Sequence, residues 1–433
     1  MQYLKRLAFM ALLGLIAVAW QEGTVFGQGK PVVVVRGNIT LDTTFSNTND
    51  YVLSGTVFVQ GPATLTIQAG TTIFGESATN GTLVIARGAR IMAEGRADAP
   101  IVFTSDQSSR ARADWGGLII NGRAPLNVPG GEAFGEGDTG VYGGNQPNDN
   151  SGVLRYVRVE FAGTEFSPDN ELNGIAFQGV GRGTEVEFVQ VHFNKDDGLE
   201  FFGGTVDVKY AVCTAIGDDS FDWTDGWKGR GQFWIGQQRG DDADQGMEAD
   251  NSAENNNLQP RSNPTIYNFT LIGDPSNARG PESDIGMLLR EGTAGRLGNF
   301  VVTGFKEIGL ELDHAATFQQ ANSGALSIRN GVFYQNGVNF SDDSAEDPRP
   351  PFTTAQWAGR STAIFEGNPL LRKPFNPRRP DFRPADNSPL VDGTLPVATP
   401  PNDGFFEAVP FIGALSNVAA ENWTQGWTNY KQQ

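Results

Sequence analysis

The sequence predicts an all-β protein, a right-handed parallel β-helix in which short strands stack as the coils of one single-stranded solenoid. Three observations favour this fold class. Strand-length runs that alternate β-branched and polar residues recur from Thr56 onward, and each ends at glycine or a polar turn. The 55 glycines are spread through the chain, and no linker divides it. Beyond the N-terminal apolar run, no segment has the apolar spacing of a helix.

Residues 1–19 have the pattern of a secretory signal peptide. Two cations, Lys5 and Arg6, precede the apolar run 7–19, which ends in the small-residue sequence Ala-Val-Ala. The run is shorter than the roughly 20 apolar residues that cross a bilayer as a helix, and no later segment approaches that length. We therefore expect a secreted protein, extracellular or associated with the outer membrane of a diderm bacterium. Its mature chain should lack a transmembrane segment and begin with a poorly ordered stretch, residues 20–30.

Charge and cysteine content indicate which partners the protein can bind and whether disulfides can stabilise it. The net charge is -18, and removal of residues 1–19 takes away two cations and no acid, which leaves -20. A chain this acidic is not expected to bind nucleic acid. Its single cysteine, Cys213, cannot form an intramolecular disulfide and lies in an apolar stretch, so its side chain should be buried. We expect a monomer that is stabilised by packing and by its hydrogen-bonded ladder.

A repeat with a period in the low twenties runs through the middle of the chain. Each copy is a glycine or serine followed by an apolar, a variable and an apolar residue, and successive copies start 24, 22, 26, 40, 23 and 28 residues apart. Such a period is the length of one solenoid coil, and the step of 40 indicates an inserted loop. Because side chains alternate along a strand, Leu199 and Phe201 should point into the coil and Glu200 outward. The copies begin at Gly174, Gly198, Ser220, Gly246, Gly286, Gly309 and Gly337.

The predicted solenoid covers residues 31–364, with exposed insertions such as residues 255–257. From residue 365 the sequence becomes proline-rich and loses the coil period, so residues 365–433 are expected to form a C-terminal cap that runs back over the solenoid. Open strand edges pair with other molecules, so an end coil needs a cover. The aromatic residues expected to cover the last coil are Phe405, Phe406, Phe411, Trp423 and Trp427.

Several long motifs carry a resemblance to a known family. They are ADWGGLIINGRAPLN (113–127), YGG (142–144), LRYVRVEFAG (154–163), DDGLEFFGGTVDVKY (196–210), DDSFDWTDGWKGRGQFW (218–234) and GFFEAVPFIGALSNVAAENWTQGWTNY (404–430). The chain resembles a widespread family of exported bacterial β-helix proteins, mostly uncharacterised, that includes a leptospiral outer-membrane lipoprotein. The resemblance implies a surface or outer-membrane protein and brings no catalytic residues with it. The sequence differs from the lipoprotein member because no cysteine that could carry a lipid lies directly after the N-terminal apolar run.

Stacking of the repeat brings acidic residues into columns. The residues two places after each repeat start are Ala176, Glu200, Asp222, Glu248, Leu288, Glu311 and Asn339. Glu200, Asp222 and Glu248 should therefore follow one another at about 4.8 Å per coil. A parallel column, one place before each start, contains Asn173, Asp197, Asp219 and Gln245, flanked by Asp196, Asp218 and Asp244. Like charges stacked in this way repel, so the columns need bound cations, basic neighbours or raised pKa values.

Calcium is the cofactor that this arrangement suggests, because Ca²⁺ takes six to eight oxygen ligands with flexible geometry. The residues predicted to bind it are Asp197, Glu200, Asp219, Asp222 and Glu248. An alternative interpretation is that Asp, Asn and Gly occupy the coil corners because they tolerate tight turns and satisfy backbone groups locally. The sequence leaves both interpretations open.

We expect a binding or structural surface component, with a polysaccharide or a cell-surface protein as its partner. Trp227 and Asp225 are the candidate ligand-binding pair, an aromatic face beside a carboxylate, although Trp227 could instead pack over the coil. The alternative function is a calcium-assisted lyase or glycoside hydrolase acting on acidic glycans, since carboxylates on neighbouring coils have the separation that glycoside hydrolysis uses. Its catalytic residues would be Glu200, Asp222, Glu248, Lys228 and Arg290.

Overall fold

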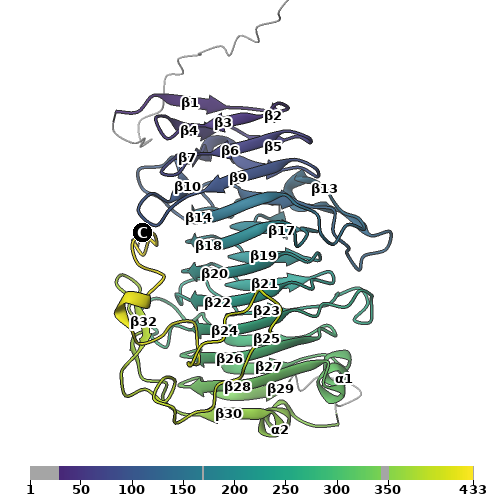
Figure 1. Ribbon diagram of the computed structural model, residues 1–433, viewed down its shortest axis with the longest axis vertical. Helices are drawn as coiled ribbons and strands as arrows, with labels where there is room; N and C mark the ends of the chain where they lie inside the picture. The colour runs from purple at the N-terminus through teal and green to yellow at the C-terminus, as the bar shows by residue number, and fades with distance from the viewer. Residues whose placement is uncertain (1–28, 168–169, 343–350, 433) are drawn as a thin grey trace, which may run out of the picture.

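The computed structural model describes residues 29–432, except 168–169 and 343–350, and has the predicted right-handed parallel β-helix fold. Short strands stack along one axis into an elongated solenoid (Figure 1). The predicted signal peptide, residues 1–19, and residues 20–28 lie outside the described residues. Within the described residues, no helix has the length and hydropathy that crossing a membrane requires.

Two long parallel sheets form the walls of the solenoid. The first sheet has 15 strands in the described residues, and its main path is β1 (Val32–Val35), β4 (Asp50–Leu53), β7 (Thr72–Gly75), β10 (Ile101–Ser105), β14 (Gly152–Glu160), β18 (Glu185–His192), β20 (Asp207–Thr214), β22 (Arg230–Gln237), β24 (Thr265–Ile272), β26 (Gly295–Thr303), β28 (Leu326–Tyr334) and β30 (Thr362–Glu366). A branch of this sheet joins it at β14 and comprises β3 (Thr43–Phe45), β6 (Thr64–Ile67) and β9 (Arg90–Glu94).

The second sheet contains the predicted repeat. Its 11 described strands are β2 (Asn38–Ile39), β5 (Thr56–Val59), β8 (Thr82–Ile85), β11 (Gly117–Asn121), β17 (Ile175–Gln178), β19 (Leu199–Phe202), β21 (Phe221–Thr224), β23 (Glu248–Ala249), β25 (Ile285–Leu289), β27 (Ile308–Leu312) and β29 (Val338–Asp342). Strands β17 to β27 stack in the register that the repeat predicts. In the last coil Glu311 is opposite Ser341 and not Asn339. The prediction for Asn339 is wrong because it used the 28 residues that separate Gly309 from Gly337. The strands instead pair Ile308 with Val338, which are 30 residues apart.

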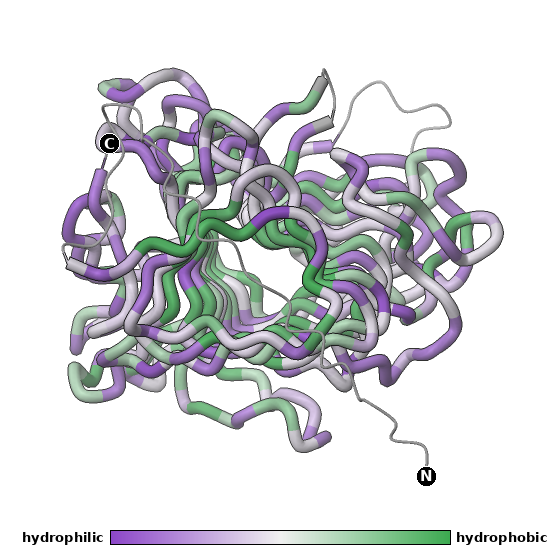
Figure 2. Tube along the Cα trace, turned by 90° about the horizontal axis from the view of Figure 1, so that it is seen from above, coloured by the Kyte–Doolittle hydropathy of each residue, from purple (hydrophilic) through white to green (hydrophobic). Residues whose placement is uncertain are grey.

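The core fills the inside of the coils. Seen along the axis, apolar residues line the inner wall and polar residues predominate on the outer loops (Figure 2). Leu199 and Phe201 are buried, as the strand alternation predicts. Phe201 stacks on Phe177 of the preceding coil with 5.2 Å between ring centroids. Each such ring contributes about 1.5–3 kcal/mol through burial, so the stacked coils supply the stability that disulfides cannot.

Each long strand of the first sheet bends at one residue with positive φ. The bend residues form a ladder along the outside of the solenoid: Tyr156, Phe188, Tyr210, Phe233, Asn268, Asn299 and Asn330. The four aromatic rings stack with centroid separations of 4.4, 4.3 and 5.0 Å. Asparagine tolerates the left-handed region better than most residues, whereas for aromatic residues the stacking compensates for the unfavourable backbone. The sequence repeat gave no sign of this ladder.

The C-terminal segment runs back along the side of the solenoid (Figure 1) and contacts this ladder, for example at Asn299 and Tyr156. We call residues 390–432 the C-terminal strap. Three side-chain amides each exchange two hydrogen bonds with its backbone: Asn299 with Ala398, at 2.8 and 2.8 Å; Gln232 with Glu407, at 2.7 and 2.8 Å; and Gln190 with Asn429, at 2.7 and 2.7 Å.

The strap's aromatic residues do not cover the last coil, so that prediction is wrong. Trp427 packs edge-on against Tyr156 and Phe188, many coils away from the end. Trp427 packs on the ladder because the stacked rings of the ladder form a continuous apolar surface on the side of the solenoid. The last coil packs instead against α2 (Thr354–Arg360), whose Trp357 joins the core.

Short helices are a second departure from the sequence prediction. Helix α1 (Ala315–Ser323) ends at Gly324 in the left-handed conformation, and α2 begins with a capping box formed by Thr353 and Gln356. Both helices have fewer than three full turns, too few for an apolar periodicity to stand out. Three antiparallel hairpins complete the described strands: β12 (Glu132–Gly135) with β13 (Gly140–Gly143), β15 (Glu165–Ser167) with β16 (Asn170–Glu171), and β31 (Leu371–Lys373) with β32 (Asp381–Pro384).

Candidate functional site

The predicted acidic column exists on strands β19, β21 and β23. Glu200 is the register partner of Asp222, and Asp222 is the partner of Glu248. Ala176 of β17 and Leu288 of β25 flank the three acids in the ladder. The column is therefore a short stack of three carboxylates between apolar neighbours.

The corner before these strands carries the second predicted column. Asp197 Oδ1 accepts a hydrogen bond from the backbone N–H of Asp219 at 3.0 Å, and Asp219 Oδ1 accepts one from the N–H of Gln245 at 2.6 Å. Each carboxylate thus ties its coil to the next, as the turn-forming interpretation of these residues predicts. This role uses Oδ1 of each side chain and leaves the second carboxylate oxygen for another partner.

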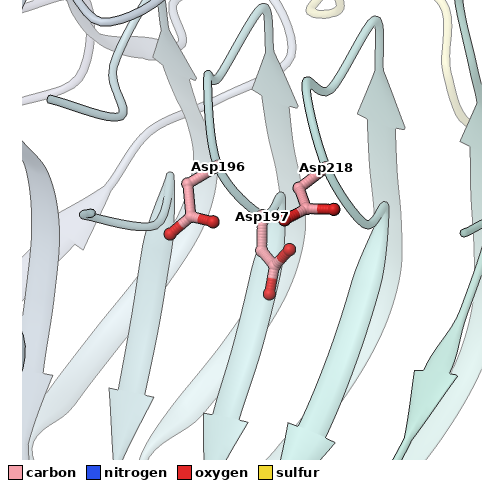
Figure 3. A group of neighbouring side chains, drawn as sticks. All are labelled: Asp196, Asp197 and Asp218. Atoms are coloured by element: carbon pink, nitrogen blue, oxygen red, sulfur yellow. The ribbon is translucent and has the colours of Figure 1, made fainter. Parts of the chain in front are cut away.

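Together the columns form three groups of carboxylates whose nearest oxygens lie within 4.8 Å of one another. The outer triad is Asp196, Asp197 and Asp218, and its side chains come from two successive turns (Figure 3). The first inner triad is Asp197, Glu200 and Asp222. The second inner triad is Asp219, Asp222 and Glu248.

The inner triads are inside the protein. Glu200 is 8% exposed and Asp222 is 9% exposed. Burial, and after it the charge of neighbouring acids, raises the pKa of Asp197, Glu200, Asp219 and Asp222 well above the ordinary range. The same two causes raise the pKa of Glu248 to about 8. Without bound cations, the column must therefore hold protons at neutral pH.

Basic side chains compensate only part of this charge. Arg290 Nε lies 3.0 Å from Asp250 Oδ1, and its Nη2 pairs with Glu248. The amide Nδ2 of Asn173 donates to Glu200, which is a neutral partner. Asp222 Oδ1 is buried and has no hydrogen-bond partner among the described residues. A buried carboxylate oxygen without a donor is costly, so the site is suited to a cation.

Two further acids that sequence reasoning missed reach the site through insertions. Glu136 lies in the hairpin that links β12 and β13, and its charge helps to raise the pKa of both Asp196 and Glu200. Burial and the charge of Glu171 raise the pKa of Glu136 itself to about 7. Neither residue belongs to the repeat, so periodicity could not locate them.

The candidate ligand-binding pair does not form a surface site. Trp227 is fully buried and stacks on Phe201 with 4.1 Å between centroids, so its prediction as an exposed sugar-binding ring is wrong. It turns inward because its indole fills the coil interior and donates from Nε1 to the carbonyl of Val206 at 3.2 Å. Asp225 is partly buried and hydrogen-bonded to Tyr142, and burial raises its pKa to about 6.

Fold and site together define a parallel β-helix with a buried acidic column. The model of the pectate-lyase-like β-helix domain matches residues 37–364, and the chain belongs to this family. Among solved structures, pectate lyase Pel9A is similar at 14% identity, over 83% of this chain and 89% of that chain, with a TM-score of 0.38. No curated protein sequence matches the chain. The narrower resemblance to exported surface proteins, with their leptospiral member, stays a prediction.

Proposed function

We propose that this protein is an exported surface β-helix, a binding or structural component whose acidic column holds a divalent cation, calcium. The observation that supports this best is the first inner triad. Asp197, Glu200 and Asp222 place three oxygens within 4.8 Å of one another inside the protein. Among the described residues, no basic side chain forms an ion pair with any of the three.

The ligand set favours calcium over other biological cations. All the ligand atoms are carboxylate oxygens, which hard cations prefer, and no His or Cys belongs to a triad. Calcium–oxygen distances of about 2.3–2.6 Å allow two oxygens on one ion to be up to about 5 Å apart. Magnesium also takes oxygen ligands but demands near-ideal octahedral geometry, whereas calcium accepts the flexible arrangement that side chains from neighbouring coils offer. Water and the spare oxygens of the acids would complete the coordination.

A lyase or hydrolase acting on acidic glycans is the second candidate, because the family is described as pectate-lyase-like. Catalysis would need a free base beside an open column. Of the two predicted bases, Arg290 is engaged by two carboxylates and Lys228 is exposed. Glu200 and Asp222, which would have to face a substrate, are almost fully covered. The geometry therefore favours a cation that stabilises the fold and shapes the surface. Incubation with acidic glycans and calcium, followed by absorbance of unsaturated products and a reducing-end assay, tests the enzyme candidate directly.

The first test is calcium content and melting temperature, each measured before and after chelation. We expect stoichiometric calcium in the wild-type protein and a lower melting temperature once it is removed. The variant Glu200→Gln, Asp222→Asn, Glu248→Gln should bind none and should not respond to chelator. A control variant with the same change in charge is Asp98→Asn, Glu254→Gln, Asp386→Asn, at exposed positions away from the column. A wild-type protein without metal whose melting temperature ignores chelator would overturn the proposal.

A further inference from the structure

We propose that the column is built for one divalent cation, at Asp197, Glu200 and Asp222, and that the guanidinium of Arg290 replaces a second cation in the next coil. This inference rests on the proposed function and deepens it, because it assigns the position and the number of the bound ions.

The two inner triads are copies of one another, displaced by one coil. Moving one coil along the register takes Glu200 to Asp222 and Asp222 to Glu248. Asp197 and Asp219 hold the matching corner positions, and each accepts a backbone N–H of the following coil. The two triads contain the same residue types, two Asp and one Glu, although the Glu occupies a different strand position in each, so the surroundings of each triad become the main difference between them.

The surroundings differ in fixed positive charge. Arg290 follows β25 in the coil after Glu248, and its backbone N–H donates to the carbonyl of Ala249 at 2.9 Å. Its side chain then reaches back over Glu248, as Nη2 pairs with that carboxylate while Nε bonds both oxygens of Asp250 at 3.0 and 3.1 Å. The guanidinium therefore already pairs with one member of the second inner triad, Glu248, and its charge acts on a second member, Asp222. Arginine suits this place because its planar group bonds two carboxylates at once.

The first inner triad has no comparable group. The position that corresponds to Asp197 one coil earlier is Asn173, which contributes an amide and no charge. Within the described part of the chain, Asp222 Oδ1 is buried and lacks any hydrogen-bond partner, and Asp222 is the residue that the two inner triads share. The outer triad is also partly neutralised, because Lys195 lies near Asp218 and pairs with Asp242 at 3.0 Å. Among the described residues, only the first inner triad combines three buried carboxylates with the absence of a direct ion pair to any of its members. The charge of Arg290 acts on Asp222, but its direct contacts are with Glu248 and Asp250.

Calcium titration of the chelated full-length protein, by calorimetry with elemental analysis, tests the assignment. We expect one calcium per wild-type chain and two per Arg290→Gln chain, because the freed second triad becomes available. Arg230→Gln is the matched control: Arg230 also pairs with two carboxylates, Asp207 and Asp403, but these belong to no triad, and this variant should keep one calcium. Two calcium ions in the wild type, or one in a folded Arg290→Gln variant, would overturn the inference and leave the proposed function standing.

A second variant removes the dependence on how Arg290→Gln folds. Glu200→Gln changes the first triad alone and should abolish calcium binding, since the second triad already holds a guanidinium. One calcium retained by Glu200→Gln would show that the second triad also binds metal and would overturn the inference. Absence of calcium from both the wild type and Arg290→Gln would instead overturn the proposed function, so the two failures are distinguishable.

Discussion

Raising the pH should destabilise the protein when its calcium is removed. Burial and neighbouring acids raise the pKa of Glu248 to about 8, whereas the unfolded chain titrates this group near its ordinary value of 4.5. Between these two values the folded state holds a proton that the unfolded state has lost. The contribution of Glu248 to stability therefore falls as the pH rises through this window and becomes constant above about 8.

The size of the effect follows from the same two values. Each pH unit within the window costs about 1.4 kcal/mol for one group, so Glu248 alone should lower the free energy of unfolding by about 4 kcal/mol between pH 5 and pH 8. The Glu248 side chain is 14% exposed, so solvent screens it little. With an unfolding entropy of about 2.1 cal/mol/K per residue, the melting temperature of a chain of this length should fall by about 5 °C.

Calorimetry in chelator at pH 5 and pH 8.5 measures this fall directly. The triple amide variant of Glu200, Asp222 and Glu248 should show a smaller fall, because three of the titrating groups are gone while Asp197, Asp219 and Glu136, whose pKa values are also raised, remain. Calcium-loaded protein should not show it either, since the cation replaces the protons and binds more tightly as the pH rises. Metal-free wild-type protein that melts at the same or a higher temperature at pH 8.5 than at pH 5 would refute the reasoning.

Three further predictions concern the fold. Cys213, fully buried and with a thiol pKa raised by burial, should react with a thiol reagent only after unfolding, and fast reaction in the native protein would contradict its placement. Gly152→Ala should cost about 2 kcal/mol or more, because φ is +119° and a Cβ would meet the carbonyl oxygen of Ile91; Gly367→Ala, with open space around it, is the control, and equal melting temperatures would contradict the expectation. Trp427→Ala should cost about 3–5 kcal/mol and expose the strap to limited proteolysis, so unchanged cleavage would show that the indole does not hold the strap.

The repeat predicted the second sheet because each copy has a glycine or serine at the same position before an apolar, variable, apolar triplet. An apolar, acidic, apolar triplet such as Leu199, Glu200 and Phe201 has only one arrangement that buries its outer members, so register followed from the spacing. The prediction failed at Asn339, where the loop before the strand has a different length and the glycine no longer marks the phase. Periodicity locates a strand only where the turn is also repeated.

The candidate site was predictable where its residues belong to the repeat and hidden where they do not. Glu200, Asp222 and Glu248 came from the spacing, and Arg290 was a candidate in the sequence, but its pairing with Glu248 and the approach of Glu136 from a hairpin depend on tertiary packing. Trp227 was misplaced because a turn residue can point inward or outward, and only the space beside Phe201 decides between them. A local sequence pattern thus predicts the positions of residues on paired strands, but it does not predict the positions of residues on loops.

The C-terminal strap should change the cooperativity with which the solenoid unfolds. A stack of coils is quasi-one-dimensional: each coil contacts only its neighbours, so it can unravel gradually from either end. The strap joins β28, through Asn330 and Pro396, to β14, through Arg158 and Trp427, and so couples coils that are distant in the stack. The coils between these anchors gain a shared long-range constraint and should unfold as one cooperative block, with the coils before β14 free to melt separately.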